Sequence, residues 1–186
     1  MTRLAIAGFA GSLSNPSRTR ALVEHAVTRT AARHGGGGEV FDLLDLGPSL
    51  GTARRLEDLD AGARGIVDTI IAADALVIAS PVFKGSYAGL FKHLFDLLDP
   101  AALAGKPVLL AATGGGEKHA LVIEHQLRPL FAFFEAQVLA TGLYASDRDF
   151  EAGRLTGAQT LARLDRAIDQ FAPFLAPANH LHAQVA

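Results

Sequence analysis

The sequence contains no cysteine and no tryptophan, and its charge is nearly balanced. Without cysteine, disulfide bonds, thiol catalysis and cysteine-ligated clusters are excluded. A formal net charge of −2, with the basic residues dispersed singly or in pairs, does not indicate nucleic acid as a partner. No apolar run approaches the roughly 20 residues of a membrane-spanning helix, and the first residues lack the long apolar core of a signal peptide. We therefore expect a cytoplasmic protein that binds neither nucleic acid nor membrane.

Charged residues are few, at 19%, whereas hydrophobic residues make up 49% of the 186 residues. This composition excludes disorder, and the length suits one well-buried domain. The apolar excess leaves surface that a partner subunit would cover. We expect a single domain over residues 1–175, a loose C-terminal tail over residues 176–186, and a homo-oligomer, either a dimer or a tetramer.

Short apolar strands alternate with amphipathic helices along the chain. This alternation predicts an α/β fold in which helices cover both faces of a parallel sheet, and ligands of such sheets bind beyond the carboxyl ends of the strands. Three motif loops fall at such ends, at residues 11–19, 80–89 and 113–119. The expected strands are residues 4–7, 40–44, 75–79 and 107–113, and the expected helices are residues 17–32, 63–73 and 87–98, with four glycines at residues 35–38 ending the first helix.

The first loop, GSLSNPSRT at residues 11–19, leads from a strand into a helix. Its hydroxyls lie beside the expected start of the helix. The free backbone N–H groups and the positive end of the helix dipole there also favour an anion. It matches neither GxGxxG nor GxxxxGK[ST], and hydroxyls in their place favour a terminal phosphate monoester such as that of FMN over a bridging pyrophosphate. The alternative is a serine-rich turn with an ordinary helix N-cap. The candidate phosphate ligands are Ser12, Ser14, Ser17, Arg18 and Thr19.

The second loop, SPVFKGSYAG at residues 80–89, offers flat side chains and open backbone amides at the end of a buried strand. A planar ring would pack there, with the amides bonding to a flavin edge. The alternative is a Pro-Gly turn that needs no ligand. Lys84 is either an electrostatic partner of reduced flavin or a solvated side chain. The candidate flavin contacts are Pro81, Val82, Phe83, Lys84, Gly85 and Ser86.

The third loop places Thr113, Gly114, Gly115 and Gly116 at the end of another buried strand. Without side chains, their backbone N–H groups are open to a closely approaching ligand. Negative charge develops at N1 and the C2 oxygen of a flavin when hydride reaches N5, and N–H groups of Gly115 and Gly116 would stabilise it. The alternative is a flexible glycine turn.

No side chain is expected to act as an acid or a base, because hydride transfer to a flavin needs only a donor ring parallel to it at contact distance. His25 and His34 are expected on helix surfaces. His180 and His182 form an HxH pattern without an evident third ligand, so no metal site is expected.

The segment over residues 119–134 is apolar around its whole axis and contains Pro129. Proline has no N–H, so the carbonyl of His125 loses its helical partner, and a kink or π-bulge is expected. The all-round apolar character predicts burial on several sides, in part by another subunit. The alternative is a proline kink in the core with no functional role.

The three loops together resemble the NAD(P)H-dependent FMN reductases of flavodoxin-like fold, especially those of bacterial sulfonate-utilisation systems. The motifs that carry the resemblance are GSLSNPSRT, SPVFKGSYAGLFKHLFDLL and ATGGGEKHALVIEHQLRP. The resemblance implies a doubly wound five-stranded parallel sheet of order 2-1-3-4-5, FMN at its carboxyl end, and NADH or NADPH stacked on the flavin. It maps phosphate contacts onto Ser12, Ser17, Arg18 and Thr19, and the ring edges onto residues 81–86 and 113–116.

Two details of the resemblance concern single residues. Many members have Arg where this chain has Ser14, so charge compensation rests more on Arg18 and the phosphate affinity is expected to be lower. Related reductases carry Tyr or His at the place of His125, in an irregular helix at a tetramer contact near the flavin.

The resemblance implies an oxidoreductase that supplies reduced FMN to a partner flavin-dependent monooxygenase, with sulfonate desulfonation as the setting. One alternative is a quinone or azo reductase that retains FMN. Another is a flavodoxin-type electron carrier, which the weak net charge and the lack of tryptophan disfavour. The choice between NADH and NADPH, the identity of the monooxygenase, and whether FMN is a substrate or a prosthetic group stay open at this point.

Overall fold

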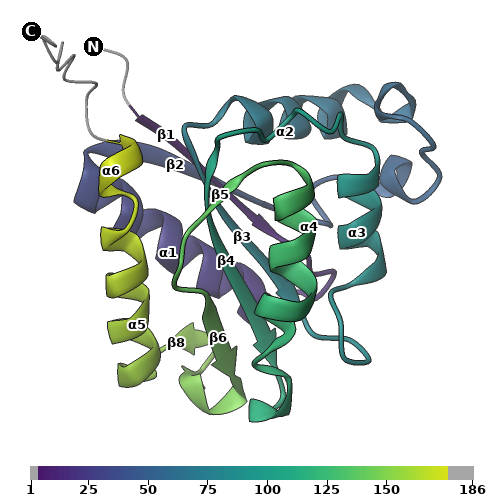
Figure 1. The fold of residues 1–186 in the computed structure, drawn as a ribbon. Helices are drawn as coiled ribbons and strands as arrows, with labels where there is room; N and C mark the ends of the chain where they lie inside the picture. The colour runs from purple at the N-terminus through teal and green to yellow at the C-terminus, as the bar shows by residue number, and fades with distance from the viewer. Residues whose placement is uncertain (1–3, 176–186) are drawn as a thin grey trace, which may run out of the picture.

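A parallel sheet forms the centre of the molecule (Figure 1). The computed structural model describes residues 4–175. The strands follow the order β2-β1-β3-β4-β5, and β6 also pairs with β4. β5 lies beside the start of β4 and β6 beside its end, so two short segments share the fifth position. The predicted order 2-1-3-4-5 is confirmed. The strands are β1 (Leu4–Ala10), β2 (Gly36–Asp42), β3 (Ala75–Pro81), β4 (Pro107–Gly114), β5 (Gln137–Val138) and β6 (Leu143–Ser146).

Helices cover both faces of this sheet, as predicted (Figure 1). One face carries α1 (Arg18–His34), α5 (Ala158–Asp169) and α6 (Ala172–Leu175), and the other carries α2 (Ala61–Ala72), α3 (Gly89–Asp96) and α4 (Arg128–Phe133). A small hairpin of β7 (Phe150–Glu151) and β8 (Arg154–Leu155) follows β6. Within residues 4–175, none of the helices has both the length and the apolar character that crossing a membrane requires.

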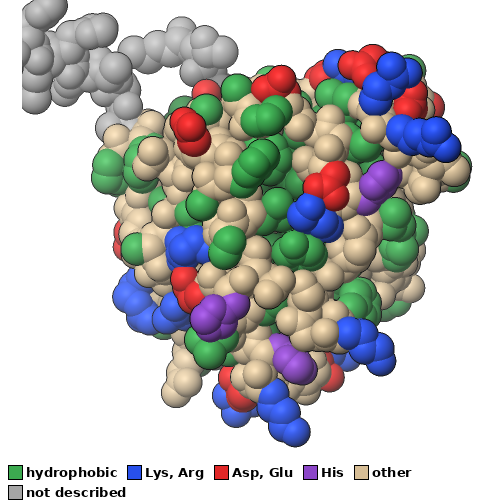
Figure 2. All heavy atoms as spheres, turned by 45° about the vertical axis from the view of Figure 1, so that its right-hand side comes forward, with side chains coloured by type: hydrophobic (Ala, Val, Ile, Leu, Met, Phe, Trp, Pro, Cys, Tyr) green, Lys and Arg blue, Asp and Glu red, His purple; other side chains and the backbone are tan. Residues whose placement is uncertain are grey.

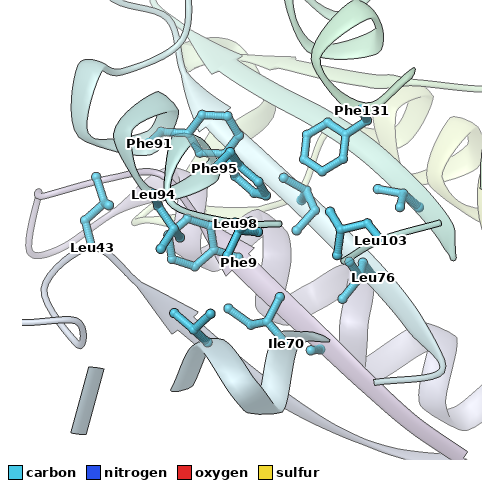
Figure 3. Close-up of a cluster of buried hydrophobic side chains, with 14 of the residues drawn as sticks. Phe9, Leu43, Ile70, Leu76, Phe91, Leu94, Phe95, Leu98, Leu103 and Phe131 are labelled. Atoms are coloured by element: carbon cyan, nitrogen blue, oxygen red, sulfur yellow. The ribbon is translucent and has the colours of Figure 1, made fainter. Parts of the chain in front are cut away.

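The face that carries α2, α3 and α4 is packed by phenylalanine rings. Phe95 of α3 lies 4.9 Å from Phe91 and 4.9 Å from Phe131 between ring centroids, and Phe9 of β1 lies 6.1 Å from Phe91. Figure 3 shows these rings between the sheet and the helices. Each buried phenylalanine removes on the order of 150–250 Å² of surface from water. This cluster therefore fixes α3 and α4 on the sheet, and with them the loops that precede both helices.

The second strand begins four residues earlier than predicted. Gly35 ends α1 in a left-handed conformation with φ of 77°, but Gly36 already belongs to β2. A Cβ at Gly36 would lie 2.8 Å from the carbonyl oxygen of Leu4, and a Cβ at Gly38 would overlap Val27 of α1. These glycines therefore allow close packing inside the sheet instead of forming a turn. A sequence pattern alone does not separate the two uses.

The segment that precedes α4 is irregular, as predicted. A 3-10 turn (Glu117–His119) is followed by a π-helix (Ile123–Leu127), and regular α4 begins only at Arg128. The π-helix lies directly before Pro129, whose missing N–H interrupts the helical hydrogen-bond ladder. The predicted π-bulge is confirmed. The helix predicted over residues 87–98 is shorter, since α3 spans Gly89–Asp96, and the tail predicted to be loose lies outside the described residues.

Candidate functional site

The three motif loops meet in one open pocket at the carboxyl end of β1, β3 and β4. Its volume is about 310 Å³. The pocket has a polar end, where α1 begins, and a flatter end made of the residues after β3 and β4. Its lining residues are Ser12, Ser14, Pro16, Ser17, Arg18, Thr19, Pro81, Val82, Phe83, Thr113, Gly114, Gly115, Ala145, Asp147 and Phe150. Of the candidate residues in these loops, Lys84, Gly85, Ser86 and Gly116 are outside this lining.

At the polar end, two serine hydroxyls accept hydrogen bonds from the backbone. Ser17 Oγ accepts from the Arg20 N–H at 3.1 Å and caps α1, and Ser12 Oγ accepts from the Ser14 N–H at 3.1 Å. Ser17 is therefore a helix N-cap, as the plainer alternative predicted. A hydroxyl that accepts still has its own proton to donate. Both serines can thus donate to an anion, beside a helix start whose first turn contains no acidic residue.

Thr19 and Thr113 join the first and third loops. Their hydroxyl oxygens lie 2.7 Å apart, and both side chains are buried. The bond ties the first turn of α1 to the end of β4. Thr19 therefore holds the polar end of the pocket against the glycine loop, in addition to its predicted contact with phosphate.

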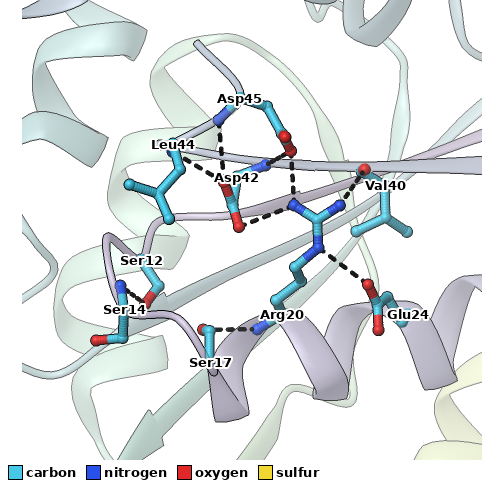
Figure 4. Close-up of polar contacts among 9 residues, drawn as sticks. All are labelled: Ser12, Ser14, Ser17, Arg20, Glu24, Val40, Asp42, Leu44 and Asp45. Atoms are coloured by element: carbon cyan, nitrogen blue, oxygen red, sulfur yellow. Dashed lines mark hydrogen bonds and ion pairs between the residues drawn. The ribbon is translucent and has the colours of Figure 1, made fainter. Parts of the chain in front are cut away.

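The two arginines at the start of α1 have different partners. Arg20 contacts Asp42 at 2.8 Å, Asp45 at 2.6 Å and Glu24 at 2.9 Å, as Figure 4 shows. Hydrogen bonds to Asp42 and then to Asp45 raise the pKa of Arg20 above its ordinary value. This network fixes the helix start on the end of β2 and occupies the Arg20 guanidinium. Arg18 instead pairs with Asp147, and both side chains are half exposed.

At the flatter end, a tight turn follows β3. Phe83 and Ser86 exchange backbone hydrogen bonds of 2.9 and 3.1 Å, and Lys84 and Gly85 between them have φ of 51° and 85°. Two positive φ values are the signature of a type I′ hairpin turn, in which glycine is favoured and lysine is unusual. The turn presents Phe83 to solvent with 57% of its surface exposed.

The same turn contacts the π-helix. Ser86 Oγ donates to Gln126 Oε1 at 3.1 Å. Gln126 lies within the π-helix, so the irregular segment and the predicted flavin-edge loop share a side-chain hydrogen bond. Sequence reasoning missed Gln126, because its partner is 40 residues away.

The glycines of the third loop differ in what surrounds them. A Cβ at Gly114 would overlap the hydroxyl of Tyr144, which donates to the Gly116 carbonyl at 2.6 Å. Burial raises the pKa of Tyr144 above its ordinary value, with Glu117 contributing, so the hydroxyl keeps its proton and donates. In the described part of the chain, no atom beyond the adjacent residues lies within 4 Å of a Cβ built at Gly115 or Gly116. Packing explains Gly114, whereas open space adjoins Gly115 and Gly116.

These features fit FMN. Hydroxyls, Arg18 and a helix start at one end suit a phosphate. An unfilled space beside Gly115, in the pocket that Pro81 and Phe83 also line, suits a flat ring. Asp147, Tyr144 and Gln126 were not predicted. Asp147 follows the end of β6, and its position after a strand was the one available signal.

The histidines lie elsewhere. His25 and His34 lie on α1, as predicted, and both are partly exposed. His34 Nε2 lies 3.0 Å from the Ile168 carbonyl, and burial, with Arg29 nearby, lowers the pKa of His25. His180 and His182 lie outside the described residues. Within residues 4–175, no three His, Cys, Asp or Glu side chains gather as a metal site would require.

The irregular segment has one buried and one exposed face. Ile123 and Phe131 are buried, whereas Leu121 and Phe133 are exposed by 64% and 65%. His125 and Pro129 are exposed as well. Figure 2 shows hydrophobic side chains scattered among polar side chains and backbone on the face that it presents. Coverage by a second subunit stays a prediction.

Comparison with known proteins identifies the family. The profile of the family "NADPH-dependent FMN reductase" matches residues 4–151. The chain is 43% identical over 168 residues to an FMN reductase (NADPH) of Pseudomonas aeruginosa, covering 90% of each chain, and 42% identical over 170 residues to the NADH-dependent FMN reductase SfnF of Pseudomonas fluorescens, covering 91% of each. The apo crystal structure of the NADH:FMN oxidoreductase EmoB superimposes with a TM-score of 0.81 at 32% identity, covering 90% of this chain and 88% of that one. This chain therefore belongs to the NADPH-dependent FMN reductase family.

Proposed function

We propose that the protein is an NAD(P)H:FMN oxidoreductase that transfers hydride from a reduced nicotinamide to FMN. The observation that carries the proposal is the pocket itself, which combines an anion-binding helix start with an open space beside Gly115. FMN supplies the redox chemistry when it is bound. The chain's own residues bind and orient it.

Each end of the pocket has a separate task in this proposal. Ser12, Ser17 and Arg18 donate hydrogen bonds to the phosphate, and Thr19 holds the helix start in place. At the other end, Pro81 and Phe83 flank the ring, and the N–H groups of Gly115 and Gly116 stabilise negative charge at its pyrimidine edge. No acid or base side chain is assigned.

A turnover assay with each nucleotide tests this function. NADH and NADPH oxidation is measured with FMN and with riboflavin, which lacks the phosphate. We expect FMN to bind more tightly than riboflavin, and Arg18→Ala to remove about 1.5–3 kcal/mol of FMN binding while leaving riboflavin unaffected. Equal affinity of the wild type for FMN and riboflavin would show that the phosphate assignment is wrong. The same assay decides the nucleotide preference.

We infer further that reduced FMN leaves for a flavin-dependent monooxygenase, with sulfonate desulfonation as the setting. The support is the sequence resemblance to reductases of sulfonate utilisation, together with the open pocket. A reductase that retains FMN and passes electrons to a quinone or azo compound is the alternative. The colour of the purified protein separates them, since retained flavin makes it yellow. The cytoplasmic location stays a prediction.

The irregular segment is proposed to serve flavin transfer and oligomer formation. Its exposed side chains Leu121 and Phe133 suit a subunit contact, and the bond between Ser86 and Gln126 couples the π-helix to the ring end of the pocket. A π-helix holds one residue more than a regular helix of the same rise. Removal of one residue therefore regularises this segment.

Deletion of His125 tests that role. We expect the deletion variant to retain FMN through gel filtration and to appear yellow, to reduce its bound flavin with NAD(P)H, and to supply a monooxygenase more slowly. His125→Ala is the matched control, because it removes the side chain and keeps the helix register. A deletion variant that is a folded oligomer, colourless and still coupled would separate the π-helix from flavin release.

A further inference from the structure

An acidic residue occupies the phosphate end of the pocket. Asp147 begins the 3-10 turn (Asp147–Asp149) after β6, and its carboxylate pairs with Arg18, the first residue of α1. Both residues line the pocket. Among the described lining residues, Arg18 is the only Lys or Arg and Asp147 the only Asp or Glu. The positive charge of Arg18 and the negative charge of Asp147 cancel, so the described lining side chains have a net formal charge of zero before a phosphate binds.

The neighbouring arginine does not change this balance. Arg20 is held by Asp42, Asp45 and Glu24, and Asp42 is buried. Breaking that network would leave a buried carboxylate without its cation, which is costly. Arg18 is different, because its single carboxylate partner is half exposed. Of the two arginines, Arg18 is the one that can exchange its partner.

A phosphate monoester carries about 1.5–2 negative charges near pH 7. In this pocket it has to take Arg18 from Asp147, and it then lies near a displaced carboxylate of the same sign. A contact present only in the ligand-free protein subtracts from the binding free energy, because the ligand has to break it. Asp147 therefore opposes FMN twice, by competition for Arg18 and by repulsion.

We propose that Asp147 is a competing anion that sets the FMN affinity and favours flavin exchange. When flavin leaves, the Asp147 carboxylate pairs with Arg18 again and stabilises the empty pocket. The residue that decides between retention and release of FMN thus lies at the phosphate end of the pocket and is not part of the π-helix. This inference rests on the proposed function, since it assumes that FMN is the occupant.

Asp147→Asn tests the proposal, because it removes the charge and keeps the shape. We expect the Kd for FMN to fall about three- to fivefold, which corresponds to about 0.65–1 kcal/mol, and the Kd for riboflavin to stay unchanged. The gain shrinks as salt is raised, because the opposed charges are exposed and screened. Purified Asp147→Asn is expected to retain more flavin after gel filtration than the wild type does.

Asp169→Asn is the matched control. Asp169 pairs with Arg33 at the other end of α1, and neither residue lines the pocket. The two ion pairs are similarly exposed: the side chains of Arg33 and Asp169 are exposed by 48% and 56%, and those of Arg18 and Asp147 by 51% and 53%. The variant changes the net charge equally and is expected to leave both flavin affinities unchanged. Asp147→Ser repeats the charge removal with a different side chain and is expected to tighten FMN as well.

Three results would overturn the proposal: an unchanged FMN affinity in both Asp147 variants, an equal gain for riboflavin, or an equal gain in Asp169→Asn. Failure of the proposed function looks different. In that case the wild type neither binds FMN nor reduces it with NADH or NADPH, whereas a wild type that does both, with unaltered binding in the Asp147 variants, refutes only the role of Asp147.

Discussion

Two glycine runs, at residues 35–38 and 114–116, look alike in the sequence and differ in the structure. In the first run, Gly36 and Gly38 lie in a strand against Leu4 and Val27, so the protein itself fills the space a side chain would need. In the second run, no atom of the described chain beyond the adjacent residues lies within 4 Å of a Cβ built at Gly115 or Gly116. A glycine run shows only that side chains are absent. The neighbours show whether the protein itself fills the space or leaves it open.

The comparison predicts its largest effect at Gly115. Gly115→Val places a branched side chain in the space assigned to the flavin edge, and we expect kcat/KM to fall by about 100-fold, as for a misplaced reacting group. The melting temperature is expected to change little, because no described atom is displaced. Gly51→Val is the control, since Gly51 also has open space and does not line the pocket. Normal turnover of Gly115→Val would make the loop a structural turn.

At Gly38 the expected loss is of stability and not of function. Gly38→Ala forces a methyl group onto Val27, and we expect the free energy of unfolding to fall by about 1–3 kcal/mol in a denaturant titration. FMN affinity of the folded fraction should be unchanged. Combining Gly38→Ala with Val27→Ala should cost less than the sum of the single variants, because the overlap is removed. Additive losses would show that Val27 is not the cause.

Gly114 belongs to the same loop as Gly115, but, like Gly38, it is packed against a side chain, that of Tyr144. Substitution of Tyr144 gives the smallest of the expected effects. Tyr144→Phe removes the hydrogen bond to Gly116 and should lower kcat/KM about two- to twelvefold, equivalent to about 0.5–1.5 kcal/mol, with little change in melting temperature. Since the pKa of Tyr144 is raised, the hydroxyl stays protonated, and the difference from the wild type should be constant between pH 6 and about 9.

A second substitution checks the reason for Gly114. Gly114→Ala should be tolerated better in the Tyr144→Phe background, because the hydroxyl that a Cβ would overlap is absent there. Unfolding free energies of the four proteins in this cycle measure the coupling. Zero coupling would mean that Tyr144 does not restrict residue 114.

The parts of the fold that were predictable are those with a local cause. β3 and β4 are continuous apolar runs buried on both faces, which no amphipathic helix resembles. The π-helix was predictable because Pro129 lacks an N–H. The start of β2 was not, since the reason for Gly38 is Val27 on another element. The divided fifth strand was not predicted either, because β5 has only two residues.

The site follows the same rule. Ser12, Ser17 and Arg18 are close in sequence and could be predicted together. Asp147 and Tyr144 could not, because Asp147 acts on Arg18 across 129 residues and Tyr144 acts on Gly116 across 28. A pair of charges that meets only in the folded chain leaves no spacing pattern to recognise.

The hydroxyl pair of Thr19 and Thr113 has a consequence for how the chain acquires its site. These residues are 94 positions apart, and they meet only after β1, β3 and β4 are aligned in the sheet. Contacts between residues so far apart in the sequence form late, because closing the long loop between them costs conformational entropy before the contact can form. A chain still emerging from the ribosome therefore has no complete pocket until its third loop has been synthesised and paired. An FMN molecule bound in this pocket, as proposed, would stabilise only chains that have reached that stage.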